Sequence, residues 1–243
     1  MNYKTPGVYV EEIPKLPPSI AQVETAIPAF IGYTERAIDE RTEESFVGEP
    51  KRITSLFEYE RFFGNPFAET SIEVNITGNI GDPDKIIVSN PDRSKYLMHY
   101  ALQMFFANGG GPCWIVSVGN YEVSGGLVNE GLLQDGLAAT EKIDEITLYV
   151  YPDAQGIEQS TNFYGVYKAT LDMCYKLKDR FAIIDIWQDT DEPDVLANIP
   201  TMRSSSLGSQ DNLLKYGATY FPNLKTNINY YYGCDGPGDE YVT

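Results

Sequence analysis

Short apolar runs alternate with stretches of helical periodicity over most of the chain, and this alternation predicts the fold class. Runs rich in β-branched and aromatic residues predict strands at 27–33, 113–118, 146–151, 181–187, 218–222 and 228–232. Apolar spacing and helix-end residues predict helices at 56–63, 91–108, 132–143, 163–178, 195–202 and 213–216. Strands that alternate with helices predict an α/β fold, here a three-layer body with a mixed, mostly parallel sheet.

Two of the predicted helices carry specific end signals. Ser55 as an N-cap with Glu58 three residues later fits a capping box, and Gly64 suits the position after the helix. Asn90 as an N-cap followed by Pro91 at the first helical position predicts the start of the second helix. These signals place the boundaries more sharply than periodicity alone.

Other stretches predict interruptions and special strands. The segment 65–92 is rich in Asn, Gly, Pro and Asp, which predicts a loop with short strands at 72–76 and 86–88. Pro200 predicts a break in the fifth helix. The continuous apolar run at 181–187 predicts a central strand that is buried on both faces.

The first 25 residues differ from this body. Val8, Tyr9, Val10 and Ile13 suit a strand, and the prolines that follow predict an extended linker. A lone strand has unpaired backbone groups, so the segment is either a frayed terminus or an arm that adds a strand to a neighbouring copy. We therefore divide the chain into an arm with a proline-rich linker (1–25) and an α/β body (26–243). The arm interpretation assigns inter-subunit contact to Tyr3, Pro6, Gly7, Val8, Tyr9, Val10, Glu11, Glu12 and Ile13.

Composition narrows the classes of partner. The chain has 243 residues, 42% of them apolar, which is enough for a substantial core. Its net charge of −17 disfavours nucleic acid and anionic membranes as partners. No run approaches the roughly 18–20 apolar residues of a membrane span, and no secretory signal is recognisable. The 18 tyrosines predict a surface suited to protein contacts.

The residues that most often carry chemistry are few and scattered. Cys113, Cys174 and Cys234 are odd in number and lack metal-ligand spacing, which predicts reduced thiols in a cytosolic setting. The single histidine, His99, falls within a predicted helix and is interpreted as structural. Asp153 follows a predicted strand, where α/β enzymes often place chemistry, but no second group pairs with it in sequence, so we interpret it as a turn residue.

Two further patterns suggest ligand sites, and both have a simpler interpretation. The glycines at 109–111 follow a helix and precede a strand, which is the reverse of the order in phosphate-binding loops. Asp82 and Asp84 flank a proline in a polar turn and supply too few ligands for calcium. We therefore predict no catalytic residue, no cofactor and no metal, and expect that the protein is not an enzyme.

Several segments resemble contractile tail sheath proteins, the family of phage tail sheaths, R-type bacteriocins and extracellular contractile injection systems. The resemblance is carried by YKTPGVYVEEI (3–13), PPSI (17–20), TAIPAFIGYT (25–34), FFANGGGPCWIVSV (105–118), LKDRFAIIDI (177–186) and YGATYFPNLK (216–225). The resemblance extends over nearly all residues of this chain, whereas the family's C-terminal segment has no counterpart here. The chain is therefore either an N-terminal fragment or a short relative.

The resemblance implies a structural subunit of a contractile sheath. Copies would form hexameric rings stacked around an inner tube, held together by strand exchange through the arm, and would rearrange on contraction. The implied partners are other copies of the chain, the inner tube protein, and baseplate and terminator proteins. The implied location is a phage tail or phage-tail-like particle assembled in the bacterial cytoplasm. Two alternatives stay open: a sheath-related terminator or adaptor subunit, and a nucleotide-binding α/β enzyme.

Overall fold

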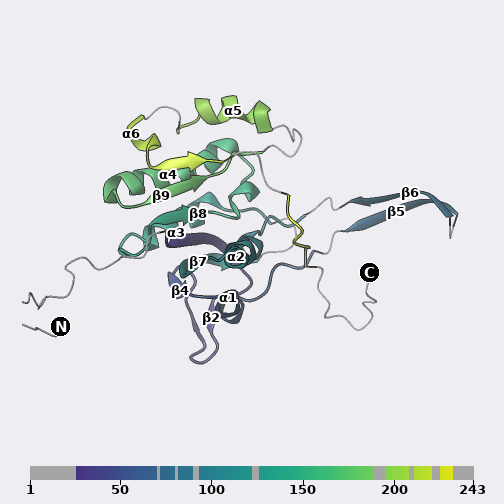
Figure 1. Cartoon of the computed structure of the whole chain (residues 1–243), viewed down its shortest axis with the longest axis horizontal. Helices are drawn as coiled ribbons and strands as arrows, with labels where there is room; N and C mark the ends of the chain where they lie inside the picture. Colours follow the sequence, from purple (N-terminus) through teal and green to yellow (C-terminus); the bar gives the residue numbers. More distant parts are fainter. Residues whose placement is uncertain are drawn as a thin grey trace, which may run out of the picture.

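A six-stranded sheet forms the centre of the computed structural model, which describes residues 26–69, 72–79, 82–89, 93–121, 126–188, 195–207, 211–220 and 225–231. The strand order is β10-β9-β8-β1-β7-β4. Every neighbouring pair is parallel except β4 with β7, which is antiparallel. The predicted mixed, mostly parallel sheet is therefore confirmed (Figure 1). The strands are β1 (Pro28–Thr34), β4 (Lys51–Ile53), β7 (Cys113–Asn120), β8 (Leu148–Val150), β9 (Phe181–Ile184) and β10 (Gly217–Thr219).

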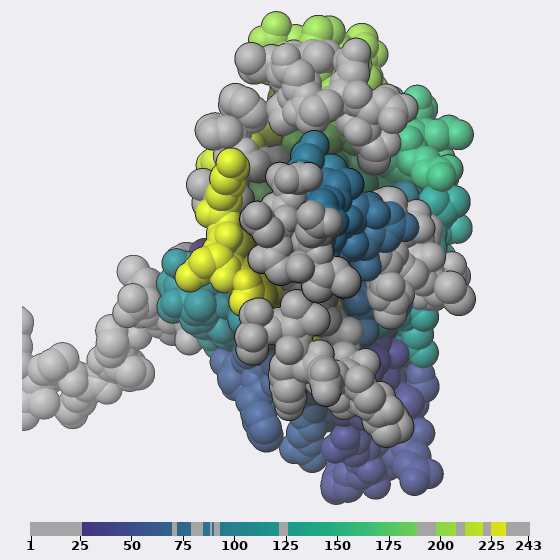
Figure 2. All heavy atoms as spheres, turned by 90° about the vertical axis from the view of Figure 1, so that its right-hand side faces the viewer, coloured from purple at the N-terminus to yellow at the C-terminus, as the bar shows by residue number. Residues whose placement is uncertain are grey.

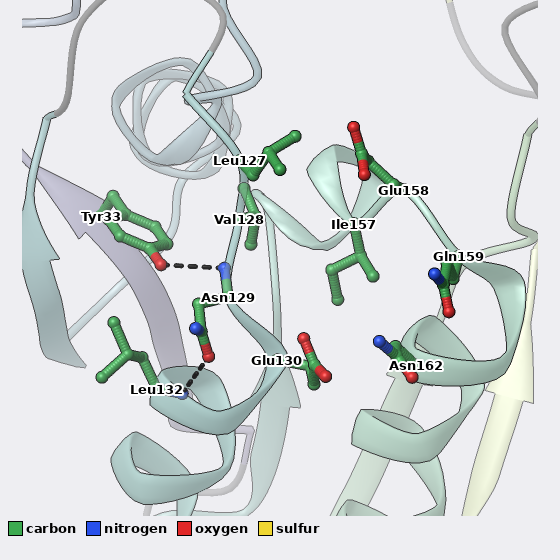
Figure 3. Close-up of a pocket in the computed structure, with 10 residues that line it drawn as sticks. All are labelled: Tyr33, Leu127, Val128, Asn129, Glu130, Leu132, Ile157, Glu158, Gln159 and Asn162. Atoms are coloured by element: carbon green, nitrogen blue, oxygen red, sulfur yellow. Dashed lines mark hydrogen bonds between the residues drawn. The ribbon is translucent and has the colours of Figure 1, made fainter.

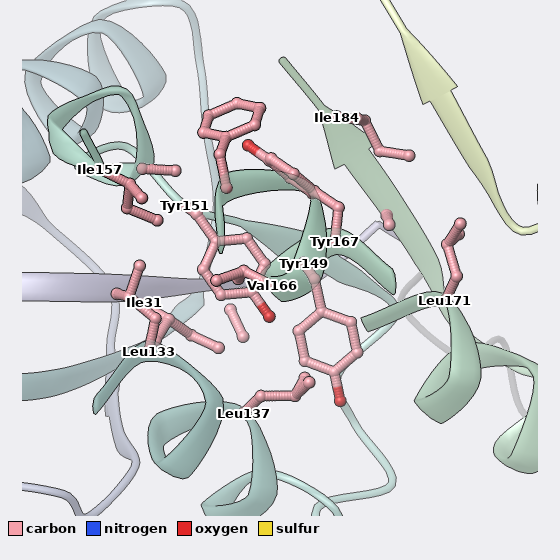
Figure 4. Packing of buried hydrophobic residues seen from close by; sticks show 14 of the residues in the cluster. Ile31, Leu133, Leu137, Tyr149, Tyr151, Ile157, Val166, Tyr167, Leu171 and Ile184 are labelled. Atoms are coloured by element: carbon pink, nitrogen blue, oxygen red, sulfur yellow. The ribbon is translucent and has the colours of Figure 1, made fainter. Parts of the chain in front are cut away.

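Helices cover both faces of this sheet and give the predicted three layers. On one face, α1 (Leu56–Phe63) and α2 (Met98–Ala107) pack over a cluster that includes Phe30 of β1. On the other face, α3 (Glu130–Ala139) and α4 (Ser160–Leu177) pack over a cluster that includes Ile31, the next residue of β1 (Figure 4). Successive side chains of a strand point to opposite faces, so β1 supplies both cores.

The remaining elements lie around this body. A short helical turn, η1 (Ala154–Gly156), follows β8, and α5 (Val195–Ser204) and α6 (Asp211–Leu214) precede β10. Two separate hairpins complete the described chain: β2 (Ile38–Asp39) with β3 (Glu44–Ser45), and β5 (Glu73–Asn79) with β6 (Asp82–Ser89). The second hairpin projects well away from the body in Figure 1. No helix among the described ranges has the length and apolar character needed to cross a bilayer.

The capping signal of α1 is confirmed, with one difference in detail. The Glu58 amide donates to the Ser55 hydroxyl at 3.2 Å, as an N-cap requires. The Glu58 carboxylate does not bond the Ser55 amide. It accepts instead from the amide and hydroxyl of Thr54, at 2.6 and 2.8 Å. These bonds hold the pKa of Glu58 below its usual range. Gly64 ends the helix at φ +84°.

Several predicted elements differ from the structure: for example, α3 ends at Ala139 rather than at 143, and β5 and β6 are longer than the short strands predicted at 72–76 and 86–88. Helix α2 begins at Met98 rather than at Pro91, because residues 93–97 are not helical; Asn90 and Pro91 themselves lie outside the described residues. Pro200 lies inside α5 without breaking it. The strand expected at 228–232 is absent from the described part of that segment, 225–231.

The segment 225–231 is instead a strap that is bonded to α2 and to the chain before β5. The Tyr231 amide donates to the Tyr100 hydroxyl at 2.9 Å, and the Glu69 amide donates to the Tyr231 carbonyl at 2.7 Å. The rings of Tyr100 and Tyr230 meet edge to face at 5.5 Å. Side-chain packing therefore fixes a segment whose composition resembles a strand.

Strand β9 is central, between β8 and β10, but it is fully buried on one face only. Ala182 and Ile184 are buried, whereas Phe181 and Ile183 are half-buried. The buried residues face the α3–α4 cluster. The α1–α2 cluster draws its strand residues from β1, β4, β7 and β8, so it does not extend to β9. This corrects the expectation of burial on both faces.

Candidate functional site

The carboxyl edge of the sheet holds the most unusual polar group of the body, the side chain of Asp153. It lies just after β8, is fully buried, and accepts three backbone hydrogen bonds. One carboxylate oxygen accepts from the amide of Tyr33 at 2.6 Å. The other accepts from the amides of Leu97 and Met98 at 2.5 and 3.0 Å. One side chain therefore ties together the ends of β1, β8 and α2.

Asp153 supplies the cap that α2 lacks in its own sequence. The residue before α2 is Leu97, which makes no side-chain capping bond, and the first turn contains no acidic residue. A helix start leaves backbone donors without intrahelical partners, and a carboxylate there also interacts well with the helix dipole. Asp153 does lie in the predicted turn, but the turn interpretation missed this capping role. The missed signal is an aspartate after a strand combined with a helix that has no polar N-cap.

Burial dominates the titration of this carboxyl group. Desolvation raises the pKa of Asp153 to about 7, although the three amide donors from Tyr33, Leu97 and Met98 act to lower it. Gly32 leaves the space for it, because a Cβ at that position would lie 2.4 Å from the Asp153 carboxylate oxygen. The group is enclosed by backbone, so its geometry fits a structural role better than chemistry on a substrate.

A shallow pocket of about 350 Å³ lies beside this edge (Figure 3). The Tyr33 hydroxyl accepts from the Asn129 amide at 3.0 Å, and the Asn129 side chain caps α3 through the amides of Gly131 and Leu132. The described lining contains the carboxylates of Glu130 and Glu158 and no Lys, Arg or His. Such a lining repels phosphate groups.

The other predicted chemistry candidates have structural surroundings. Burial raises the pKa of the Cys113 and Cys174 thiols to about 12, so both stay protonated at neutral pH. His99 lies 3.2 Å from a carboxylate oxygen of Glu60, and burial lowers its pKa below the ordinary value. Gly109, at φ +83°, lies just after the C-terminus of α2. Within the described ranges, no group of three His, Cys, Asp or Glu side chains could hold a metal ion.

Many tyrosines lie in the core rather than on the surface. Two of their hydroxyls bond other buried side chains: Tyr151 bonds the Thr170 hydroxyl at 2.7 Å, and Tyr149 accepts from the Arg180 guanidinium at 2.5 Å. Among the described residues, Tyr175 and Tyr220 are exposed. The prediction of a tyrosine-rich contact surface is therefore wrong for the part of the body that the structure describes. The buried tyrosines are Tyr33, Tyr59, Tyr96, Tyr149, Tyr151, Tyr164 and Tyr167.

The residues assigned to inter-subunit contact fall outside the described part of the chain. They are Tyr3, Pro6, Gly7, Val8, Tyr9, Val10, Glu11, Glu12 and Ile13. The described chain begins one residue before Ile27, whose amide donates to the Thr147 hydroxyl at 2.8 Å and whose carbonyl accepts from the Thr147 amide at 2.9 Å. The point at which the arm would join the body is therefore fixed to the sheet.

Comparison with known proteins shows a likeness to solved structures, and one of them is described here. No protein-family model matches the chain, and no curated protein matches its sequence. Among solved structures, a chain in the cryo-EM structure of the anti-feeding prophage (AFP) baseplate in its contracted state has a similar fold, with a TM-score of 0.51 and 18% sequence identity. The likeness covers 90% of this chain and 50% of that chain. The protein thus shares a fold with, and spans about half the length of, a chain of a contractile particle.

Proposed function

We propose that this protein is a structural subunit of a contractile sheath around an inner tube. Copies are joined by strand exchange through residues 3–13 and rearrange on contraction. The observation that carries the proposal is the fold likeness over nine-tenths of the chain to a chain of the contracted AFP baseplate. The sequence resemblance to tail sheath proteins supports the same machine independently of the fold.

The attachment of the arm suits a tether that carries load. The segment 1–25 leads directly into β1, which lies in the interior of the sheet between β7 and β8. Both neighbours are parallel to β1: β8 pairs with its first three residues, Pro28 to Phe30, and β7 pairs with it from Ala29 to Thr34. A pull on the arm is therefore shared by two ladders of backbone hydrogen bonds, whereas an edge strand would have one.

The energetics of strand exchange suit an assembly that must hold and still move. Each backbone hydrogen bond contributes about 0.5–1.5 kcal/mol net, so an arm that makes about four contributes a few kcal/mol per subunit. A single such contact is weak, but repetition through a lattice makes the sum large. The proline-rich linker at 14–18 would set the distance between neighbouring bodies.

The proposal assigns partners and includes no catalytic step. The partners are other copies of the chain, an inner tube protein, and baseplate and terminator proteins, in a phage tail or phage-tail-like particle assembled in the bacterial cytoplasm. The charge of −17 argues against nucleic acid and anionic membranes. The pocket near Glu130 and Glu158 argues against the nucleotide-binding alternative, which predicts a clear thermal shift with nucleotides.

A second candidate function has an observation in its favour. The similar structure is described as a baseplate, which fits an adaptor or terminator subunit of the same kind of machine. The two roles differ in what the assembled protein builds. Electron microscopy of the chain expressed with an inner tube protein separates them, because a sheath subunit forms tubes and an adaptor stops at rings.

The arm is tested by deletion of residues 1–13. We expect the loss of tubes in electron micrographs, with an unchanged far-UV circular dichroism spectrum from the body. A finer test replaces Val8 and Val10 with proline, which removes two backbone donors without shortening the chain. The matched control, Val8→Thr with Val10→Thr, keeps those donors and should assemble. Tubes formed by the deleted chain would contradict the arm proposal.

A further inference from the structure

The β5–β6 hairpin presents an apolar face that its own chain leaves uncovered. In the register of the hairpin, Ile76 lies opposite Ile86, with Val74 two residues earlier on the same face. These side chains are 62%, 56% and 53% exposed. Ile72, in the same alternation, is 36% exposed. The patch formed by these four residues is called the aliphatic face below.

The opposite face of the hairpin is mostly polar. It carries the pairs Glu73 with Ser89 and Thr77 with Lys85, and Asn75 opposite Ile87. Ile87, 44% exposed, is the one aliphatic residue among these six. One apolar and one polar face is the pattern of a strand pair that packs on a core through one side. Here the described body supplies no third strand, since β5 and β6 form a sheet of two.

The base of the hairpin is held firmly. Glu69 is buried, and its carboxylate accepts from the amide of Ser94 at 3.1 and 3.2 Å, which joins the chain before β5 to the chain after β6. The Glu69 amide also donates to Tyr231 of the strap. The hairpin is thus anchored at its base, while its aliphatic face extends into solvent. In Figure 2 the blue hairpin points toward the viewer from this end of the molecule.

We propose that the aliphatic face docks on a second copy of this chain, as a repeated contact in the assembly. This inference deepens the proposed function, because it names a second contact between subunits besides the arm. The hairpin projects on the side toward which the parallel strands run, whereas the arm joins at the amino end of β1 (Figure 1). Contacts that leave opposite ends of a subunit connect copies head to tail, as rings and helical stacks require.

The uncharged character and the small area of the aliphatic face suit a weak, repeated contact with a second copy. A chain of net charge −17 repels its own copies, so a contact between copies needs an uncharged patch, and the aliphatic face carries no ionisable side chain. Stable pairwise interfaces bury about 800 Å² on each partner. Three or four half-exposed aliphatic side chains provide only a patch of the order of a few hundred Å². Such a patch is too small for a tight isolated complex and suits a weak contact repeated in a lattice.

Sedimentation velocity of the full chain over a concentration series tests this contact. The variant Ile76→Thr with Ile86→Thr keeps β-branched residues and removes apolar area from the aliphatic face. We expect its association constant to fall by at least about tenfold. The matched control is Ile87→Thr, which makes the same change at the adjacent residue on the polar face and should leave the association constant within about twofold of the parent value. Circular dichroism and the melting temperature verify that both variants stay folded.

Several outcomes would overturn the docking proposal. A parent chain that stays monomeric at every concentration excludes a second copy as the occupant. Equal association of the parent and the double variant, or an equal loss in the control, excludes the aliphatic face as the contact. The deletion of residues 1–13 tests the arm separately. If the deleted chain still forms tubes while the Ile76→Thr, Ile86→Thr variant loses association, the arm proposal fails and the hairpin contact stands.

Discussion

The central sheet and the β5–β6 hairpin both carry aliphatic strand faces, yet only the faces of the sheet are covered by helices. Ile31 in β1 is completely buried under α3 and α4, whereas Ile76 in β5 is 62% exposed. Both are β-branched residues on an apolar strand face. The difference teaches that alternation identifies a face that requires an apolar neighbour, without stating whether that neighbour belongs to the same chain.

The body and the hairpin also differ in the opposite sense, because the body buries a polar group whereas the hairpin exposes apolar ones. The body buries the carboxyl group of Asp153 and meets it with three backbone amides, while the hairpin leaves aliphatic side chains in water. A buried carboxyl group is tolerated where the ends of several elements converge with unpaired donors. The packing of layers therefore decides burial at both sites more strongly than residue type does.

The largest expected effect tests the contrast between the two aliphatic faces. Ile31→Ala should lower the free energy of unfolding by about 2–5 kcal/mol, because it leaves a cavity in the packed core. Ile76→Ala should change it by no more than about 0.5–1 kcal/mol, because the residue is mainly exposed. Urea unfolding at low protein concentration measures both. Equal losses would show that the hairpin packs against its own chain.

The next effect concerns the carboxylate at the edge of the sheet. Asp153→Ala leaves the amides of Tyr33, Leu97 and Met98 without their acceptor and should cost about 2–3 kcal/mol at pH 7. The matched control is Asp172→Ala on the surface of α4, where the partner is the half-exposed Lys168. That change should cost at most about 0.5 kcal/mol. A variant at Asp153 as stable as the control would refute the capping role.

The smallest effect is the pH dependence of that capping. The pKa of Asp153 is raised to about 7 in the folded chain, against about 3.9 for an unfolded aspartate. Between these values the folded state holds a proton that the unfolded state has lost, so the free energy of unfolding falls as the pH rises. From pH 5 to pH 8 the parent should lose about 2 kcal/mol more than Asp153→Ala.

Unfolding curves of both proteins at pH 5, 6.5 and 8 measure this difference. The comparison with the variant removes the contribution of the other titrating groups. If the gap between the two proteins stayed constant from pH 5 to 8, the three amide donors would offset burial, and the pKa of Asp153 would lie at or below its ordinary value.

Much of the architecture was predictable from local pattern. Apolar runs separated by segments of helical periodicity predicted five of the six strands of the sheet, all but β4. The same alternation predicted the mixed, mostly parallel arrangement. Ser55 and Gly64 fixed the ends of α1 because caps act within a few residues of the backbone groups that they satisfy. Information of this kind is local, so the sequence carries it directly.

Other features depend on groups that are distant in the sequence and meet only in the folded chain. The carboxylate of Asp153 caps a helix that begins 55 residues earlier, at Met98. Tyr100 holds the strap at Tyr231, 131 residues away. Hydrophobic periodicity cannot predict such contacts, because neither residue of a pair stands out from the local pattern of its own segment.

By itself, the sequence determined the alternation of elements and the acidic charge. It also predicts a division between residues 1–25 and the body. The tertiary structure alone decided which apolar faces are covered, because coverage depends on where the layers end. It left the aliphatic face of the β5–β6 hairpin exposed and enclosed Asp153. The local sequence determines which apolar faces require cover and which polar groups require hydrogen-bond partners. Only the packing of the whole chain shows which of these the chain itself supplies.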